Sequence, residues 1–262
     1  MLFKKWFKNI KPNTEFIAQN VVYYKKIDST NISAYNTECE DGTLFVAETQ
    51  TAGKGRMGRS WVSQKGCGIW MSIALMPNTM PQHINTITLA SGLALCEALN
   101  QIYNLPFKIK WPNDIVVNKK KLCGILTESK TQNGKITKII VGIGINVNQK
   151  SFPEEIKDMA TSLFIQTGKK SFRAKIINVF AEIFEHYYNM VLNGNTAEII
   201  EKYKKLCVNI NMDVVATKNN EQIKGKVIDI CHTGDLIIKK EDGTTLNINS
   251  GEVSVRGMYG YI

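Results

Sequence analysis

The sequence lacks the cysteine spacing of a metal-binding protein. Its cysteines form no CxxC pair, so we expect them to be reduced and structural. A secretory signal is also missing, as is any apolar run near the ~20 residues that a membrane span needs. We therefore expect a cytoplasmic protein with no membrane partner. The cysteines are Cys39, Cys67, Cys96, Cys123, Cys207 and Cys231.

The sequence also lacks internal repeats and low-complexity tracts, which argues against a repeat architecture and against extensive disorder. Apolar residues make up 44% of the 262 and charged residues 21%, the balance of a soluble globular protein. A chain of this length can bury a sizeable core, in one large domain alone or with a small appendage.

Acidic residues are in deficit, since 23 Asp and Glu stand against 33 Lys and Arg, a net charge of +10. Such an excess can indicate a nucleic-acid partner, but lysine-rich surfaces are common and we expect a solvated one. The charge is concentrated in LFKKWFKNIK, where aromatics stand among lysines. This stretch could touch a membrane surface or nucleic acid, yet it is short and favours a solvated or docked helical turn.

The chain up to about Leu206 predicts a sheet with helices. Apolar residues recur at helical spacing over residues 83–103, and Asn133–Gly134 is a strong hairpin signal. A second helix is predicted from the Ser171 cap onward, with another to about Leu206. β-Branched and aromatic residues predict strands in VVYYKKI, GTLFVAET, GIWMSIALM, FKIKW, DIVVN, LCGILTES and ITKIIVGIGINV.

After Cys207 the sequence pattern changes to that of short strands, separated by turns at Asn219–Asn220, Thr233–Gly234 and Asp242–Gly243. This pattern predicts a small all-β barrel of about fifty residues. We therefore divide the chain into a basic N-terminal segment (1–20), a large sheet-and-helix domain (21–207) and a C-terminal domain (208–262).

The stretch TAGKGRMGRS (51–60) satisfies G-x-G-x-x-G and nearly satisfies the phosphate loop G-x-x-x-x-G-K-[ST]. Both motifs require a helix directly after the glycines, because the helix N-terminus supplies the donors for phosphate. Here a strand pattern follows, so both interpretations fail. What remains is a long flexible loop from Gln50 to Gly68 carrying Lys54, Arg56, Arg59 and Lys65, which suits closure over a phosphate-bearing ligand or, alternatively, an exposed hairpin loop.

Each of three further stretches can be interpreted either as part of a functional site or as an ordinary structural feature. KWPNDIVVNKKKLCGI places Trp, Asn and Asp at a strand end, and a hairpin returns Lys121 toward them; the alternative is a well-made turn. Gly142 and Gly144 interrupt an apolar strand, which indicates close backbone or ligand approach, or a bulge. DSTN (28–31), taken alone, is a helix cap.

In this order, DSTN, QTAGKGRMGRSW, KWPNDI, KLCGIL and GIGINVN resemble the biotin protein ligase family, and the similarity extends through ATSL to GEVSVRG. The resemblance implies an α+β fold: a mixed, mostly antiparallel sheet backed by helices, of the class II synthetase-like kind. A small SH3-like C-terminal barrel follows it.

The resemblance also implies the reaction. Biotin and ATP form biotinyl-5′-AMP, and biotin then passes to one lysine of the biotin carboxyl carrier domain of a biotin-dependent carboxylase. Lys121 would contact biotin's carboxylate and the α-phosphate, Arg56 and its loop neighbours would close over the adenylate, and Asp114 would orient or deprotonate the acceptor amine. Mg²⁺ is expected with ATP, with unknown protein ligands.

The binding sets follow from the same resemblance. The residues expected at biotin are Ser29, Thr30, Asn31, Gln50, Gly53, Lys54, Gly55, Arg56, Lys121, Gly124, Gly142 and Gly144. Those expected at ATP or the adenylate are Arg56, Arg59, Trp61, Lys110, Asn113, Lys121 and Asn146.

Two features depart from the family. Lys54 stands where the family has arginine, which weakens any bidentate side-chain role there. The residues before DSTN are too few for the winged helix-turn-helix of family members that repress transcription, so we expect no repressor function and no DNA partner. A homodimer through a sheet edge is possible, as in relatives.

Two other functions compete with this interpretation. A lipoate or octanoate ligase or transferase shares the fold but typically carries three glycines near a histidine, whereas none of His83, His186 and His232 lies beside a glycine cluster. A basic nucleic-acid-binding module is suggested by charge and by the C-terminal barrel, yet an aromatic recognition pattern is missing.

Overall fold

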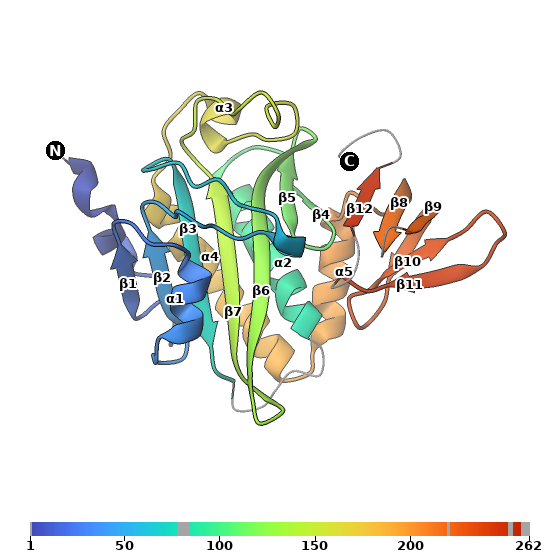
Figure 1. Ribbon diagram of the computed structural model, residues 1–262, viewed down its shortest axis with the longest axis horizontal. Helices are drawn as coiled ribbons and strands as arrows, with labels where there is room; N and C mark the ends of the chain where they lie inside the picture. Colours follow the sequence, from blue (N-terminus) through green and yellow to red (C-terminus); the bar gives the residue numbers. More distant parts are fainter. Residues whose placement is uncertain (1, 78–83, 219–220, 251–253, 258–262) are drawn as a thin grey trace.

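The computed structural model describes residues 2–77, 84–218, 221–250 and 254–257. They form a seven-stranded mixed sheet with helices on both faces, followed by a separate five-stranded antiparallel sheet (Figure 1). The predicted fold class is thereby confirmed.

The large sheet has the strand order β1-β2-β3-β7-β6-β5-β4. Only the β1–β2 pair is parallel among the described strands, and the remaining pairs are antiparallel. Strands β2 and β3 are buried along their whole length, because helices cover both faces of the sheet there. The strands are β1 (Val21–Tyr24), β2 (Thr43–Ala47), β3 (Gly68–Leu75), β4 (Lys108–Lys110), β5 (Asp114–Val117), β6 (Lys120–Gln132) and β7 (Lys135–Asn146).

The hairpin between β6 and β7 turns at the predicted dipeptide. Asn133 and Gly134 both adopt positive φ, 51° and 74°, as a two-residue type I′ turn requires. The turn sets the pairing as far as Thr131, and a β-bulge between Lys130 and Thr131 shifts it by one residue, which places Gly124 opposite Gly144 and Leu126 opposite Gly142. The turn and the bulge together align three glycines in the middle of the sheet.

Three helices back one face of the sheet, and a short helix lies on the other (Figure 1). The back helices are α2 (Ile84–Ile102), α4 (Arg173–Leu192) and α5 (Thr196–Leu206), and the front helix is α1 (Thr30–Asn36). The short helix α3 (Leu163–Thr167) follows β7 and was not predicted. The predicted helix over 83–103 is confirmed from Ile84 onward, since His83 lies outside the described residues.

The predicted Ser171 cap is wrong. Helix α4 begins at Arg173 with Phe172 as its N-cap, and no side chain caps it. Ser171 instead exchanges backbone hydrogen bonds with the Asn148 side chain, donating its N–H at 2.9 Å and accepting at 3.2 Å. A contact between segments distant in sequence therefore overrides the local capping preference.

The C-terminal sheet has the order β11-β10-β9-β8-β12. Gly234 and Gly243 adopt positive φ in the predicted turns, whereas the turn predicted at 219–220 lies outside the described residues. Trp111 fixes this sheet to the large one, because its indole N–H donates to the Gly234 carbonyl at 3.0 Å. The strands are β8 (Asp213–Lys218), β9 (Glu221–Ile230), β10 (Leu236–Lys239), β11 (Thr245–Ile248) and β12 (Ser254–Gly257).

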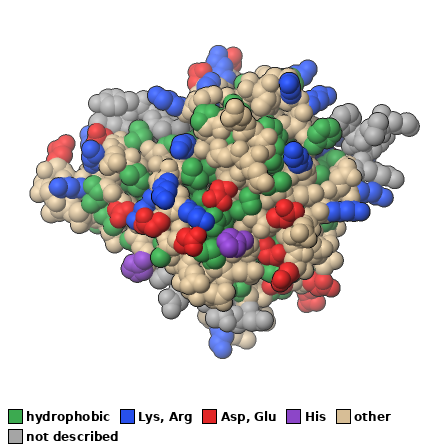
Figure 2. All heavy atoms as spheres, turned by 180° about the vertical axis from the view of Figure 1, so that it is seen from behind, with side chains coloured by type: hydrophobic (Ala, Val, Ile, Leu, Met, Phe, Trp, Pro, Cys, Tyr) green, Lys and Arg blue, Asp and Glu red, His purple; other side chains and the backbone are tan. Residues whose placement is uncertain are grey.

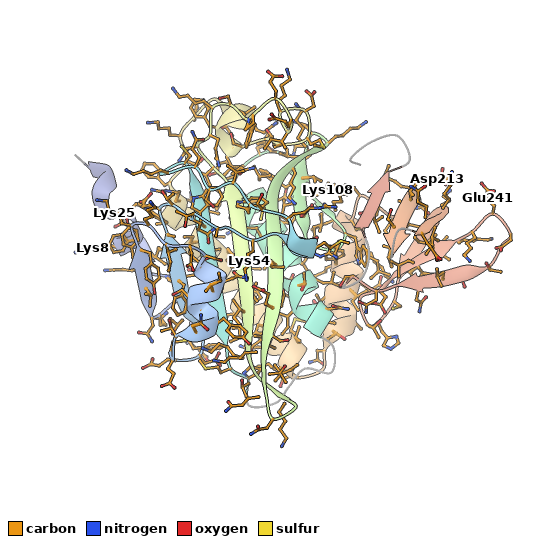
Figure 3. All side chains as sticks on the ribbon, in the orientation of Figure 1. Lys8, Lys25, Lys54, Lys108, Asp213 and Glu241 are labelled. Atoms are coloured by element: carbon orange, nitrogen blue, oxygen red, sulfur yellow. The ribbon has the colours of Figure 1, made fainter. Side chains whose placement is uncertain are left out.

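The basic N-terminal segment is a docked 3-10 helix, η1 (Leu2–Asn9). Trp6 is buried beneath the Arg173 guanidinium, which lies 3.9 Å from the ring centroid, and its indole N–H donates to Glu48. Phe7 stacks on Tyr23 of β1. The segment therefore packs as part of the domain, with Lys8 beside β1 (Figure 3).

The surface seen from behind carries Lys and Arg side chains interspersed with Asp and Glu (Figure 2). Such mixing is typical of a solvated surface. Among the described residues, no helix combines the length and apolar character needed to cross a bilayer.

A buried carboxylate anchors the segment that leads into β1. Glu185 of α4 is 6% exposed and accepts the backbone N–H groups of Glu15, Phe16 and Ile17 at 2.7–3.2 Å. The contact to Ile17 is buried and those to Glu15 and Phe16 are partly buried, so a protein acceptor stabilises these amides.

We predict that Glu185→Gln lowers the free energy of unfolding by about 1–3 kcal/mol, because the neutral amide leaves part of this donor cluster unsatisfied. Urea unfolding measures the change. Glu182→Gln is the matched control on the exposed face of the same helix, where one contact to the Asn13 N–H at 2.9 Å is affected, and it should shift stability by less than about 0.5 kcal/mol. Equal losses in both variants would contradict the anchoring role.

Candidate functional site

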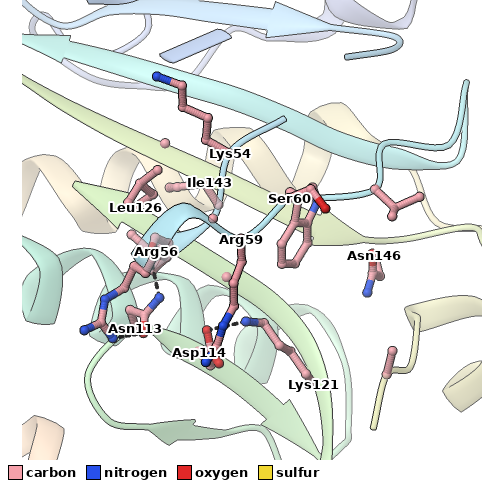
Figure 4. A pocket seen from close by; sticks show the side chains of 18 of the residues that line it. Lys54, Arg56, Arg59, Ser60, Asn113, Asp114, Lys121, Leu126, Ile143 and Asn146 are labelled. Carbon is pink, nitrogen blue, oxygen red and sulfur yellow. Dashed lines mark hydrogen bonds and ion pairs between the residues drawn. The ribbon is translucent and has the colours of Figure 1, made fainter. Parts of the chain in front are cut away.

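One cavity of about 1290 Å³ opens on the front face of the large sheet. Its walls come from the N-terminus of α1, the loop between β2 and β3, the ends of β5, β6 and β7, and the segment after β7 (Figure 4). The predicted site residues that line it are Ser29, Thr30, Asn31, Gln50, Lys54, Gly55, Arg56, Arg59, Trp61, Lys110, Asn113, Asp114, Lys121, Gly124, Gly142, Gly144 and Asn146. Their ligand roles stay predictions.

Gly53 is the predicted site residue that does not line the cavity. A Cβ at this position would lie 2.6 Å from the Trp61 carbonyl oxygen, and the Gly53 carbonyl accepts the Trp61 N–H at 2.8 Å. Close packing within the loop accounts for a glycine at this position, and its predicted role at biotin stays a prediction.

The glycine-rich loop folds as a miniature hairpin over the cavity. Lys54 and Ser60 form a β-bridge, and the Gly55 N–H donates to the Arg59 carbonyl at 2.7 Å. The tip is the 3-10 turn η2 (Arg56–Gly58), where Gly58 has φ 71°. This turn directs the Arg56 side chain into the cavity.

Arg56 joins the loop to both sheets. Its guanidinium donates to Asn113 Oδ1 at 3.0 Å and to the backbone carbonyl of Ser250 in the C-terminal domain. Burial lowers the pKa of Arg56, although the Asp114 carboxylate acts in the opposite direction. The guanidinium is therefore partly desolvated, which strengthens its attraction for an anion that enters the cavity.

Asp114 and Lys121 form an ion pair at the centre of the site. The Lys121 ammonium lies 2.7 Å from Asp114 Oδ1, and the side chains are 27% and 14% exposed. A register shift between Ile115 and Val116 in the β5–β6 hairpin sets their relative placement. Asn113 locks the same hairpin by donating its amide to the Ile125 carbonyl at 2.7 Å.

The other cations of the site differ in how they are placed. Lys110 is 4% exposed in the cavity wall. Figure 4 shows Arg59 reaching toward Asp114 and Lys121, whereas the ammonium of Lys54 points away from this cluster. Lys54 contributes its backbone to the loop hairpin through the bridge to Ser60.

A buried polar network occupies the end of the cavity near α1. The side-chain oxygen Oε1 of Gln50 accepts the Thr30 N–H at 2.8 Å, and Ser72 donates to Asn31 Oδ1. The Asn31 amide then donates to Glu128 at 2.7 Å. Ser72 and Glu128 were missed by sequence reasoning, because Ser72 is a single polar residue in an apolar strand and Glu128 lies in the polar half of β6, where it does not stand out.

The DSTN stretch does begin a helix, yet Ser29 makes no side-chain capping hydrogen bond. Its side chain is buried and lines the cavity. Gly142 of β7 lies against the Asn31 side chain of α1, since a Cβ at Gly142 would meet Asn31 Oδ1 at 2.0 Å. The glycine is therefore required for α1 to approach the sheet.

Trp61 lies flat against two paired glycines. A Cβ at Gly124 or Gly144 would be 2.8 Å or 2.6 Å from its indole ring, and the Lys121 ammonium is 5.3 Å from the ring centroid. A close approach was predicted at Gly144, and the structure shows one at both glycines, where the partner is an aromatic side chain of the loop. Trp61 therefore packs the loop between β2 and β3 against strands β6 and β7.

Asn146 ends β7 at the far end of the cavity. Gln149, three residues later, also lines the cavity and donates its amide to Asn146 Oδ1 at 3.1 Å. Sequence reasoning missed Gln149, and the only available signal was its position directly after GIGINVN. Within the described residues, no group of three or more His, Cys, Asp or Glu is arranged to hold a metal ion.

Comparisons with known proteins agree with this geometry. Residues 23–146 match the biotin/lipoate A/B protein ligase family, and residues 210–256 match the biotin protein ligase C-terminal domain. The bifunctional ligase/repressor BirA of Bacillus spizizenii is 38% identical over 235 residues, covering 88% of this chain and 72% of that protein. The biotin--[acetyl-CoA-carboxylase] ligase of Mycobacterium tuberculosis is 29% identical over 218 residues, with 81% and 79% covered.

A solved structure is similar throughout its length. The biotin protein ligase from Aquifex aeolicus in complex with biotin and ATP superposes with a TM-score of 0.83 at 35% identity, covering 91% of this chain and 99% of that one. The chain therefore belongs to the biotin protein ligase family.

Proposed function

We propose that this chain is an ATP-dependent biotin protein ligase that forms biotinyl-5′-AMP and transfers biotin to a carrier lysine. One observation carries the proposal: in a member of this family, a cationic loop and a cationic hairpin meet at one cavity that also holds a buried polar recess. Activation of a carboxylate by ATP needs both features.

The recess at the N-terminus of α1 suits the ureido ring of biotin. Ser29, Thr30 and Gln50 supply hydroxyl and amide groups there, and Met71 and Ile143 supply apolar wall. A small number of fixed polar groups in an apolar pocket gives orientation and specificity. Biotin bound this way directs its carboxylate toward the cation cluster.

The cation cluster serves adenylation. A carboxylate oxygen of biotin attacks the α-phosphorus of ATP, the bond to the pyrophosphate oxygen breaks, and pyrophosphate leaves. Two anions must approach each other, so positive charge fixed at their meeting point lowers the barrier. Lys121 and Arg56 supply this charge, and the Asp114 carboxylate holds the Lys121 ammonium in place before the ligands enter.

The transfer of biotin to the carrier takes place at the same residues. The neutral amine of the carrier lysine attacks the carbonyl carbon of the adenylate, and AMP leaves. Asp114 orients the amine or accepts its proton, because it is the carboxylate of the central pair. The partner is the biotin carrier domain of a carboxylase.

Trp61 and the loop shelter the intermediate. A mixed anhydride hydrolyses in water, so exclusion of solvent protects it between the two steps. We propose that Mg²⁺ enters with ATP and is held mainly by phosphate oxygens and water, as Mg²⁺ commonly is at nucleotide sites.

The direct test incubates the purified protein with biotin, ATP and Mg²⁺ and then adds a carboxylase carrier domain. Labelled carrier, with release of pyrophosphate that depends on biotin, is the expected result. Labelling with octanoate or lipoate in place of biotin would contradict the proposal.

We predict that Lys121→Ala slows biotinyl-adenylate formation by at least about 100-fold, because the charge at the meeting point of the two anions is lost. Single-turnover release of pyrophosphate measures this step. Lys120→Ala is the matched control, since the neighbouring ammonium contacts the Lys157 carbonyl instead. An unimpaired adenylation step with slow carrier transfer would show that the assigned role is wrong.

We predict that Arg56→Gly releases the adenylate about 10- to 100-fold faster, because a charge-assisted contact to the ligand is lost. Labelling of lysines on a protein that is not a carrier should rise with it, and this labelling is measured by mass spectrometry. Lys65→Gly removes a charge from the exposed part of the same loop, away from the cavity, and should behave as the wild type. Equal leakage from both variants would exclude a specific role for Arg56.

A further inference from the structure

Two carboxamide side chains stand together at the end of the cavity farthest from α1. Asn146 and Gln149 are 6% and 3% exposed and both line the cavity. Gln149 Nε2 donates to Asn146 Oδ1 at 3.1 Å. Because a carboxamide has a donor end and an acceptor end, this one bond fixes which end of Asn146 is which.

Gln149 itself is held by its backbone. The Ser162 hydroxyl donates to the Gln149 carbonyl at 2.6 Å, and the same hydroxyl accepts the Ile165 N–H as the N-cap of α3. The segment after β7 is thus tied to a helix start, which limits the places that the Gln149 side chain can reach.

The side chain of Gln149 has one polar contact. Its Oε1 atom is buried and has no hydrogen-bond partner among the described residues. A buried acceptor without a partner is unfavourable for folding, so an apolar side chain of similar length would serve the fold as well or better. The glutamine is explained by what it does to Asn146.

We propose that Gln149 is a positioning residue that sets the amide of Asn146 to read a purine with a 6-amino group. This inference rests on the proposed use of ATP. On its Watson–Crick edge adenine offers the acceptor N1 beside the N6 donor, and a fixed carboxamide pairs with both. Hypoxanthine and guanine offer the reverse order, a donor at N1 and an acceptor at O6, so they match only the opposite amide orientation.

The test compares binding of ATP and ITP to the full chain by competition with a fluorescent nucleotide. The wild type should prefer ATP. In Gln149→Met the amide of Asn146 is no longer fixed, and the preference should fall by at least about tenfold, with weaker ATP binding, unchanged biotin binding and an unchanged or higher Tm. Gln166→Met is the matched control, because this glutamine bonds to Thr161 and Asn118 outside the cavity, and the preference should be retained.

Gln149→Glu provides a second, directional readout. A carboxylate only accepts hydrogen bonds, so it should turn the amide of Asn146 and shift the preference toward ITP beyond the Gln149→Met value. An ATP-to-ITP ratio in Gln149→Met within about twofold of the wild type, or a wild type without preference for ATP, would overturn the inference.

Biotin-dependent release of pyrophosphate is measured on the same preparations. A wild type that prefers ATP but releases no pyrophosphate with biotin would refute the proposed function alone. The binding ratio would still decide the role of Gln149, so the two failures are distinguishable.

Discussion

The ion pair between Lys121 and Asp114 is the contact on which the site depends. Arg56 and Lys110 line the same cavity, and like charges gathered away from bulk water repel one another. A carboxylate at 2.7 Å offsets part of that repulsion and keeps the central ammonium ordered. The site can therefore remain folded without its ligands and still attract two anions. When the anions bind, their negative charges add to that of Asp114 in offsetting the repulsion among the cations.

The fold meets this constraint by joining segments that are distant in sequence. The β2–β3 loop brings Arg56, and the β5–β6 hairpin brings Asp114 and Lys121. Paired glycines on β6 and β7 allow Trp61 to lie flat between the loop and the sheet. The C-terminal domain takes part through the Ser250 carbonyl that accepts from Arg56, which gives it a role at the site beyond that of an appendage.

Patterns among neighbouring residues predicted much of this architecture, whereas contacts between residues distant in sequence were missed. The Asn133–Gly134 turn follows from backbone conformation alone, and the glycine-rich loop was placed between strands because its neighbours exclude a helix. Ser171 was misjudged because Asn148, far away in sequence, binds its backbone. Glu128 and Gln149 gave no pattern of their own, since each is recognised only by its hydrogen bond to a site residue, Glu128 to Asn31 and Gln149 to Asn146.

The central claim is that this cavity makes an acyl adenylate and keeps it. Native mass spectrometry of the protein after incubation with biotin, ATP and Mg²⁺ tests that claim most directly. We expect a complex heavier by the mass of biotinyl-5′-AMP, which disappears when carrier domain is added and reappears as biotin on the carrier. A spectrum with bound ATP and bound biotin but no adenylate, under conditions in which a known ligase forms it, would contradict the account.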